Sequence, residues 1–291
     1  MMTIRDIFKK ITANEDVNFL LTNRIPRIAL TRFMGWFSQI QNPIVKHLSI
    51  SLWKSFADLD LSEARKTQFD SLHDCFIREL KPGARTVDHT GKVFISPCDG
   101  IVGAIGRVES GRLYQAKGFP YTMQDLLGEQ SSSSHWEDGW FITIRITSSM
   151  YHRFHAPYQG KLKRVQYFSG DTWNVNPIAL KRVEKLFCKN ERALLEIEVG
   201  PQAYPVALVP VAAVLVASIR LHALNGLLRD KCNSPTITTC DVDFEKGDEL
   251  GWFQHGSTII VFAPKEFVIT DEIKEGKVLK MGEALMHLPS Q

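Results

Sequence analysis

The chain has 291 residues, of which 44% are hydrophobic and 23% are charged, so it can bury a large core and lacks the composition of a disordered chain. The formal net charge of +3 argues against nucleic acid as the main partner, although it is compatible with an anionic membrane surface. The cysteines are odd in number and include no C-x-x-C pair, which predicts reduced thiols in a protein that faces the cytosol. They are Cys75, Cys98, Cys188, Cys232 and Cys240.

The N-terminal segment, up to about Arg24, is expected to be a loosely attached leader. It carries several charges and has no apolar run followed by a small-residue cleavage site, so no secretory signal is expected. The most apolar run of the chain, Val206–Ile219, is shorter than a membrane span and contains Pro210. Its valine-rich composition predicts a buried strand instead.

Two amphipathic helices are predicted next. Pro26 is suited to the start of the first, and Asn42 with Pro43 fits an N-cap and the first position of the second. Aromatic and basic residues accompany both, so two interpretations stay open: a hairpin packed on a core, or an anchor that buries its apolar face in the headgroup region of a membrane. The residues of the apolar stripes are Leu30, Phe33, Met34, Phe37, Val45, Leu48, Leu52 and Phe56.

The pattern changes near residue 90. Ser62–Leu80 predicts one or two helices that end at Pro82, whereas later runs are short, apolar or alternating, and separated by turn residues. We therefore predict an α+β fold, with a helical region in residues 1–90 and a mainly antiparallel β core with helical inserts in residues 91–291. The predicted strands are Val93–Ile95, Ile101–Val108, Trp140–Ile146, Leu162–Phe168, Ala193–Val199, Val206–Ile219 and Thr258–Phe262, the inserts are Thr122–Leu127 and Pro177–Phe187, and Ser131–His135 is an exposed loop.

Three short motifs contain the residue types of a nucleophilic triad. Ser257 lies between Gly256 and an apolar run, Asp99 lies in SPCDG, and His152 and His155 lie in YHRFHAP. By residue type alone the signal is weak, because a Gly-Ser pair ordinarily forms a turn and a histidine is often a hydrogen-bonded structural residue. An ordinary serine hydrolase is one alternative, but the chain lacks a G-x-S-x-G elbow around a nucleophile that precedes a helix. A membrane-binding module without catalysis is another.

The exact strings around these residues carry more information. FIRELKPGAR, SPCDG, QAKGFPY, YHRFHAP, SGDTWNVNP, LFCKNER and GDELGWFQHGST occur in one order, and together they resemble the phosphatidylserine decarboxylases, a pyruvoyl-dependent family. The resemblance extends from about Ile28 to the region of Met281. One residue departs from it: His255 stands where the family usually has an apolar residue, which adds a titratable group beside the expected cleavage site.

The resemblance implies a protein that cuts its own chain between Gly256 and Ser257. The Ser257 hydroxyl would attack the Gly256 carbonyl, and elimination with loss of ammonia would leave a pyruvoyl group at residue 257, covalently part of the small chain that starts there. The large chain would be residues 1–256. The pyruvoyl carbonyl would form a Schiff base with the serine amine of phosphatidylserine and release CO2 and phosphatidylethanolamine, with no external cofactor.

The resemblance also implies roles for the other residues. His155 would be the base of self-cleavage, oriented by Asp99, and His152 would act in the later decarboxylation. Lys117 and Arg192 are candidates for either phosphate or structural contacts. No metal site is expected at His152 and His155, since no third ligand accompanies them.

The family resemblance implies a location and partners as well. The substrate is a membrane lipid, so the N-terminal helices would bind the anionic, cytoplasmic face of the cell membrane peripherally. A homodimer of cleaved heterodimers is the expected assembly, and nucleic acid is not expected as a partner.

Overall fold

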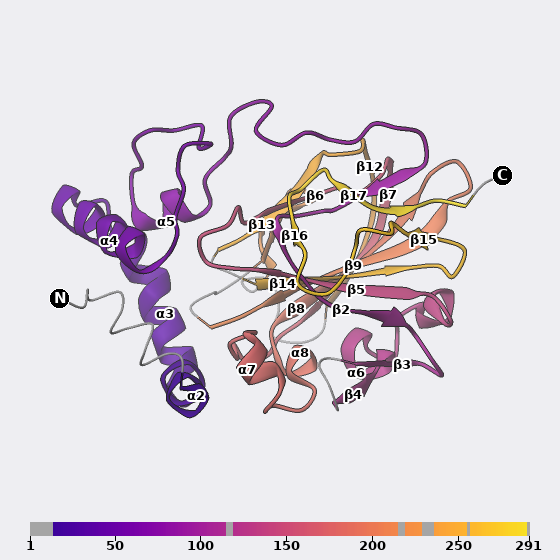
Figure 1. The fold of residues 1–291 in the computed structure, drawn as a ribbon, viewed down its shortest axis with the longest axis horizontal. Helices are drawn as coiled ribbons and strands as arrows, with labels where there is room; N and C mark the ends of the chain where they lie inside the picture. The colour runs from indigo at the N-terminus through magenta and orange to yellow at the C-terminus, as the bar shows by residue number, and fades with distance from the viewer. Residues whose placement is uncertain (1–13, 115–118, 215–218, 229–235, 255–256, 290–291) are drawn as a thin grey trace.

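A computed structural model describes residues 14–114, 119–214, 219–228, 236–254 and 257–289 of the chain. Helices come first along the sequence, and strands that pair in antiparallel fashion dominate after Val93 (Figure 1). The fold is therefore α+β with mainly antiparallel sheets, in agreement with the predicted class. In the described part of the chain, no helix combines the length and the apolarity needed to cross a bilayer.

The first helical part contains α2 (Glu15–Asn23), α3 (Arg27–Phe37) and α4 (Pro43–Phe56). The predicted starts of α3 and α4 are confirmed: α3 begins directly after Pro26, and the side chain of Asn42 accepts the backbone N–H groups of Ile44 and Val45. In Figure 1 these helices project to one side of the sheets.

The prediction of a loose leader is wrong for α2. Asn14 caps this helix, and its side chains attach it to the loop before α7 (Pro177–Leu180). Asn23 accepts the backbone N–H of Asn174 at 3.0 Å, and Asn176 donates to Asn18 at 3.1 Å. Short polar contacts of this kind leave no hydrophobic period in the sequence, which is why the pattern missed them.

The prediction of one or two helices in Ser62–Leu80 is confirmed only for a short part of the segment. Only α5 (Leu72–Phe76) is helical there, capped by the Ser71 hydroxyl. The two ends of the segment instead bond to each other, since Arg65 N–H donates to the Glu79 carbonyl and Lys81 N–H to the Glu63 carbonyl, both at 2.9 Å. These hydrogen bonds close the segment into a loop whose ends lie antiparallel.

An eight-stranded sheet forms the centre of the molecule, in the order β12-β7-β8-β9-β14-β5-β2-β16. Strand β14 lies between β9 and β5, so both of its edges are hydrogen-bonded. The strands are β2 (Gly100–Arg107), β5 (Trp140–Ile146), β7 (Gly160–Phe168), β8 (Arg192–Val199), β9 (Tyr204–Ala212), β12 (Thr236–Phe244), β14 (Ser257–Ala263) and β16 (Val278–Leu279).

Smaller sheets complete the core. The β11-β10-β13-β6 sheet is made of β6 (Arg153–His155), β10 (Ile219–Leu221), β11 (Leu224–Leu227) and β13 (Glu249–Phe253). The others contain β1 (Val93–Ile95), β17 (Ala284–His287) and β15 (Val268–Ile269), and the hairpin of β3 (Arg112–Tyr114) and β4 (Pro120–Thr122). The run predicted as one strand, Val206–Ile219, is divided between β9 and β10, which lie in different sheets.

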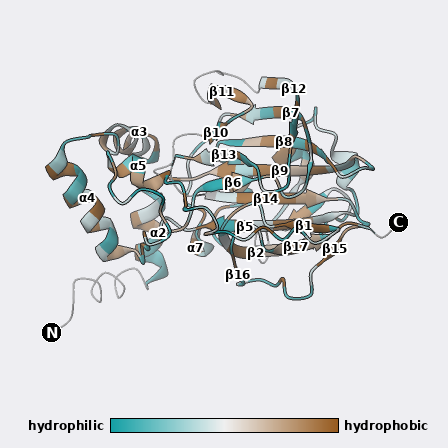
Figure 2. Ribbon diagram, turned by 90° about the horizontal axis from the view of Figure 1, so that it is seen from above, coloured by the Kyte–Doolittle hydropathy of each residue, from teal (hydrophilic) through white to brown (hydrophobic). Residues whose placement is uncertain are grey.

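Both faces of the eight-stranded sheet are covered by apolar residues. One face packs against the smaller sheets, and the other against α6 (Met123–Leu127), η1 (Ser133–Trp136), α7 and α8 (Leu186–Lys189). The predicted helical inserts thus correspond to α6 and to α7 with α8, and the loop expected near Ser131 includes η1. Figure 2 shows α2–α4 beside the sheets, and several large apolar side chains of these helices are exposed, among them those of Trp36 and Leu48.

Candidate active site

Two connections of the chain join the eight-stranded sheet to the sheet that contains β6 and β13. Residues 254–256 join β13 to β14, and residues 147–152 join β5 to β6. Ser257 pairs with Ile146, the last residue of β5, while at the other end the Phe253 N–H donates to the His152 carbonyl at 3.0 Å. The described connection 147–152 therefore runs from the strand partner of Ser257 to His152, and we call this connection with its two ends the corner. The corner begins beside the Ser257 backbone and ends at His152.

The Ser257 backbone is held firmly in place at this corner. It is the first residue of β14 and pairs with Ile146 on one side and Ala212 on the other. The expectation that Ser257 heads a strand, and not a helix as in a serine hydrolase, is confirmed. Gly256 and His255, on the other side of the expected cleavage bond, lie outside the described residues.

His152 is fully buried at the corner. Its ring lies against the ring of Phe76 of α5, with 3.9 Å between the ring centroids. Phe76 in turn stacks on Trp53 of α4 at 5.6 Å. A chain of aromatic contacts therefore connects the histidine beside Ser257 to the N-terminal helices.

His155 lies at the opposite end of the β6–β13 pair, where it faces Glu249. Its Nδ1 is 2.8 Å from the carbonyl oxygen of Gly247, which can only accept, so Nδ1 carries the proton. Its Nε2 then accepts from the Tyr151 hydroxyl at 3.0 Å. Burial lowers the pKa of His155, which keeps the imidazole neutral at physiological pH.

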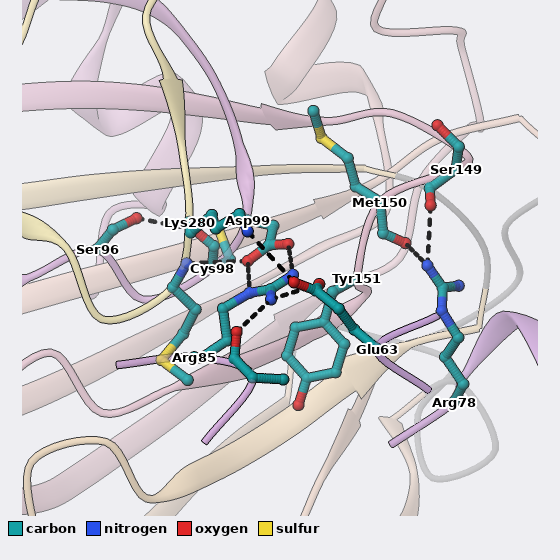
Figure 3. A network of polar contacts seen from close by, with 12 residues as sticks. Glu63, Arg78, Arg85, Ser96, Cys98, Asp99, Ser149, Met150, Tyr151 and Lys280 are labelled. Carbon is teal, nitrogen blue, oxygen red and sulfur yellow. Dashed lines mark hydrogen bonds and ion pairs between the residues drawn. The ribbon is translucent and has the colours of Figure 1, made fainter. Parts of the chain in front are cut away.

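Asp99 binds an arginine that the sequence analysis did not single out. Arg85 donates from Nε and Nη2 to the two carboxylate oxygens at 2.8 and 2.5 Å, and the Met281 N–H donates to Oδ1 at 2.9 Å (Figure 3). Arg85 also donates to Glu63 at 2.7 Å. The side chains of Arg85 and Asp99 are each only 8% exposed, so this is a buried ion pair.

The expected hydrogen bond from His155 to Asp99 is therefore replaced by other contacts. Among the described residues, both imidazole nitrogens of His155 bind other groups, and the oxygens of Asp99 bind Arg85 and Met281. The two motifs still adjoin, because the His155 N–H donates to the Pro97 carbonyl at 2.7 Å. The bidentate geometry explains the preference, since a buried carboxylate gains more from a guanidinium fork than from a neutral imidazole.

A cavity of about 270 Å³ opens beside this cluster. Tyr151, His155 and Arg85 line it together with charged residues of both signs. The remaining lining residues are Glu79, Leu80, Lys81, Gly83, Glu249 and Met281. Arg85 and Tyr151 are the residues that sequence reasoning missed, although both lie inside the quoted motifs KPGAR and YHRFHAP.

A second buried arginine holds the β5–β6 connection. Arg78 donates from Nη2 to the carbonyls of Ser149 and Met150, at 2.9 and 3.2 Å (Figure 3). Burial lowers the pKa of Arg78. It attaches the segment after α5 to the residues immediately before Tyr151 and His152, and so restricts where the histidine can lie.

Two sequence candidates for phosphate contacts have different outcomes. Lys117 lies outside the described residues. Arg192 is buried, and its guanidinium is bound to backbone carbonyl oxygens, so it is a structural residue. Among the residues that the structure describes, no three His, Cys, Asp or Glu side chains come together as metal ligands would.

Replacing Arg85 with methionine is expected to lower the free energy of unfolding by about 3–5 kcal/mol, because Asp99 would stay buried without its counter-charge. Urea denaturation measures this loss. Arg65→Met is the matched control, since the Arg65–Glu79 pair is exposed and should contribute at most about 1 kcal/mol. Equal losses in the two variants would show that the buried Arg85–Asp99 pair contributes no more to the free energy of unfolding than the exposed Arg65–Glu79 pair.

Comparisons with known proteins agree on one family. A family model described as phosphatidylserine decarboxylase matches residues 72–287. The chain is 32% identical over 291 residues to a phosphatidylserine decarboxylase proenzyme of Shewanella sp. (strain MR-4), which covers 95% of this chain and 98% of that protein. It is also 32% identical to the proenzyme of that name from Saccharophagus degradans, over 95% of this chain and 99% of the relative.

Proposed function

The chain belongs to the phosphatidylserine decarboxylase family, and from that premise we propose that it is a self-processing enzyme whose pyruvoyl group forms from Ser257. The curated relatives are named proenzymes, which supports a maturation step. The observation that carries the proposal is the position of Ser257: it begins a central strand that is paired on both edges, directly after the three-residue connection that contains Gly256.

The firm hold on Ser257 favours attack on the neighbouring peptide bond. The shift from peptide to ester is uphill in a free chain, and orientation of the reacting atoms can contribute roughly 7–11 kcal/mol. Here the pairs to Ile146 and Ala212 hold the backbone on the Ser257 side of the bond. The residues present thus fit the formation of a pyruvoyl group at position 257.

The pyruvoyl group supplies a carbonyl that condenses with the amine of phosphatidylserine and accepts the electrons that the departing carboxylate leaves. His152 has the position for moving a proton in this step. It is buried at the end of the connection that starts at the strand partner of Ser257, and burial excludes the water that would otherwise compete as proton donor. Its contact with Phe76 fixes the plane of the ring.

We propose that His155 and Asp99 act in self-cleavage by holding neighbouring residues in position. Neutral His155 holds Tyr151, which directly precedes His152, and Asp99 lies between Arg85 and the Met281 backbone. The contact to Tyr151 thus holds the His152 end of the connection 147–152. The role of base in self-cleavage, which the family resemblance implies for His155, stays a prediction.

We propose further that α3 and α4 bind the cytoplasmic face of the cell membrane. Trp36, Ile44 and Leu48 have 64%, 70% and 62% of their surface exposed, which is unusual for side chains of this size. Arg32, Lys46 and Lys54 lie on the same helices, and each basic residue near an anionic surface adds about 1 kcal/mol.

The homodimer of cleaved heterodimers remains a prediction.

The double variant Trp36→Ser, Leu48→Ser is expected to lower the partition coefficient onto phosphatidylglycerol-containing vesicles at least about 10-fold. Burial of one such side chain contributes about 1.5–3 kcal/mol. Flotation of the protein with vesicles, at low and at high salt, measures the partition coefficient. Val268→Ser, Val278→Ser is the control, since these exposed valines lie on β15 and β16, away from the helices. Equal binding of both variants would contradict the proposal.

The decisive test of the function is CO2 release from phosphatidylserine labelled in the serine carboxylate, presented in mixed micelles. We expect purified, cleaved protein to release labelled CO2 from the lipid and none from free serine. A cleaved protein that is inactive on the lipid would refute the substrate assignment.

A further inference from the structure

A row of paired residues crosses the eight-stranded sheet one position away from Ser257. Thr258 of β14 is the partner of Arg145 on β5 and of Val211 on β9, and Val211 is the partner of Arg192 on β8. Directly opposed residues of antiparallel strands point to the same face and have Cβ atoms about 4.5–5.5 Å apart. Two arginines therefore share one face and one row.

The guanidinium groups of Arg192 and Arg145 differ in their hydrogen-bond partners. Arg192 donates to the backbone carbonyls of Leu126, Cys188 and Asn190 and of Asp125, at distances from 2.6 to 3.2 Å. Its ring neighbour is Phe168, 4.4 Å from the guanidinium carbon. Four of the five N–H donors of this guanidinium are bound to backbone carbonyls, so Arg192 is held as a structural residue.

Arg145 has no such partners. It is partly buried, yet within the described residues no hydrogen bond, ion pair or aromatic ring meets its guanidinium. Burial lowers the pKa of Arg145, and no neighbouring carboxylate opposes that shift. A partly desolvated cation without a counter-charge costs stability, and proteins retain such groups where an anion binds.

The hydroxyl opposite Arg145 is also unsatisfied. Thr258 is 1% exposed, and its Oγ1 has no hydrogen-bond partner among the described residues. A buried hydroxyl in this state costs about 1–3 kcal/mol. Two polar groups that have no partner among the described residues thus lie side by side on one face of the sheet, one position along β14 from the residue at which the pyruvoyl group is proposed to form.

We propose that Arg145 binds the phosphodiester of the lipid substrate, with the Thr258 hydroxyl as a neighbouring donor. This inference rests on the proposed function. A guanidinium fork matches the paired oxygens of a phosphodiester. The group keeps its charge throughout the reaction, whereas the carboxylate loses its charge as CO2 leaves.

This difference in charge favours the phosphodiester over the carboxylate as the ligand of Arg145. A cation on the departing carboxylate would stabilise the substrate more than the transition state and would slow the reaction. A cation on the phosphodiester stabilises both states equally, so it lowers KM and leaves kcat unchanged.

The test uses cleaved enzyme and phosphatidylserine at varied mole fraction in detergent micelles. Arg145→Gln is expected to raise KM by about 10- to 100-fold, the range for loss of a charge-assisted hydrogen bond, with kcat changed by less than about 2-fold. The KM of Arg145→Lys should lie between those of the wild type and of Arg145→Gln. Arg107→Gln, at the far end of the β2–β5 pair, is the control and should behave as wild type.

Inhibition by phosphatidylethanolamine distinguishes the two anionic groups, because this product keeps the phosphodiester and lacks the carboxylate. Its inhibition constant should rise in Arg145→Gln by the same factor as KM. An unchanged KM, or a lower kcat with unchanged product inhibition, would overturn the inference. So would uncut chains in both Arg145 variants, which would make Arg145 structural. Wild-type protein that releases no CO2 would instead refute the proposed function itself.

Discussion

Ser257→Ala is expected to give a single uncut chain of 33.0 kDa that releases no CO2 from phosphatidylserine. The variant removes the only atom of residue 257 that can attack the Gly256 carbonyl, and with it the source of the pyruvoyl group. The paired backbone of β14 does not depend on the hydroxyl, so the fold should persist. The loss of activity should therefore be complete and not accompanied by unfolding.

A denaturing gel, intact mass and a thermal melt together check this expectation. Wild-type protein should show a large chain and a small chain that begins at residue 257 with a blocked N-terminus. Ser131→Ala is a suitable control, since Ser131 lies in the loop before η1, far along the chain from the cleavage site. A Ser257→Ala protein that is cut and active would refute both the cleavage site and the cofactor.

His152→Gln and His155→Gln are expected to fail at different stages. His152→Gln should still cut itself but release CO2 at least about 100-fold more slowly, because a positioned proton-transfer group contributes about 10²–10⁴-fold. His155→Gln should accumulate as uncut precursor, since it disturbs the contacts to Tyr151 and Gly247 that hold the corner. The same gel and CO2 assay read both outcomes.

The pair of variants also separates placement from chemistry. Tyr151→Phe removes only the hydroxyl that His155 accepts from, and should slow self-cleavage while leaving the cleaved fraction active. If His152→Gln stays uncut and His155→Gln cleaves normally, the two roles are reversed. If Tyr151→Phe cleaves at the wild-type rate, the contact to His155 does not support the corner.

The two buried arginines near the site illustrate how the N-terminal region contributes to it. Arg85 joins Glu63 to Asp99, and Arg78 joins the segment after α5 to the carbonyls before Tyr151. The helices proposed to meet the membrane are therefore connected to the corner by ion pairs, backbone contacts and the aromatic chain from Trp53 to His152. Lipid bound at α3 and α4 would lie against elements that also position the reacting residues.

Local pattern was sufficient for much of the fold. The apolar runs predicted most of the strands of the central sheet, and the Pro26 and Asn42-Pro43 signals located the starts of α3 and α4, because strand burial and helix capping depend on neighbours within a few residues. The short strands β6 and β13 were missed, since three to five residues carry too little periodicity. They are nevertheless the strands that carry His155 and lead to Ser257.

The sequence by itself determined the family of this protein and the residue types of its chemistry, since motifs are written in single residues and their order. Only the tertiary structure decided which of them meet. Asp99 binds Arg85, His155 binds Tyr151, and His152 shares a corner with the Ser257 backbone. Among the described residues Arg145 has no polar partner, while Arg192 donates to four backbone carbonyls. These pairings depend on strand register and on which buried charged groups come together. The residues involved are far apart in the chain, so no local sequence pattern predicts them.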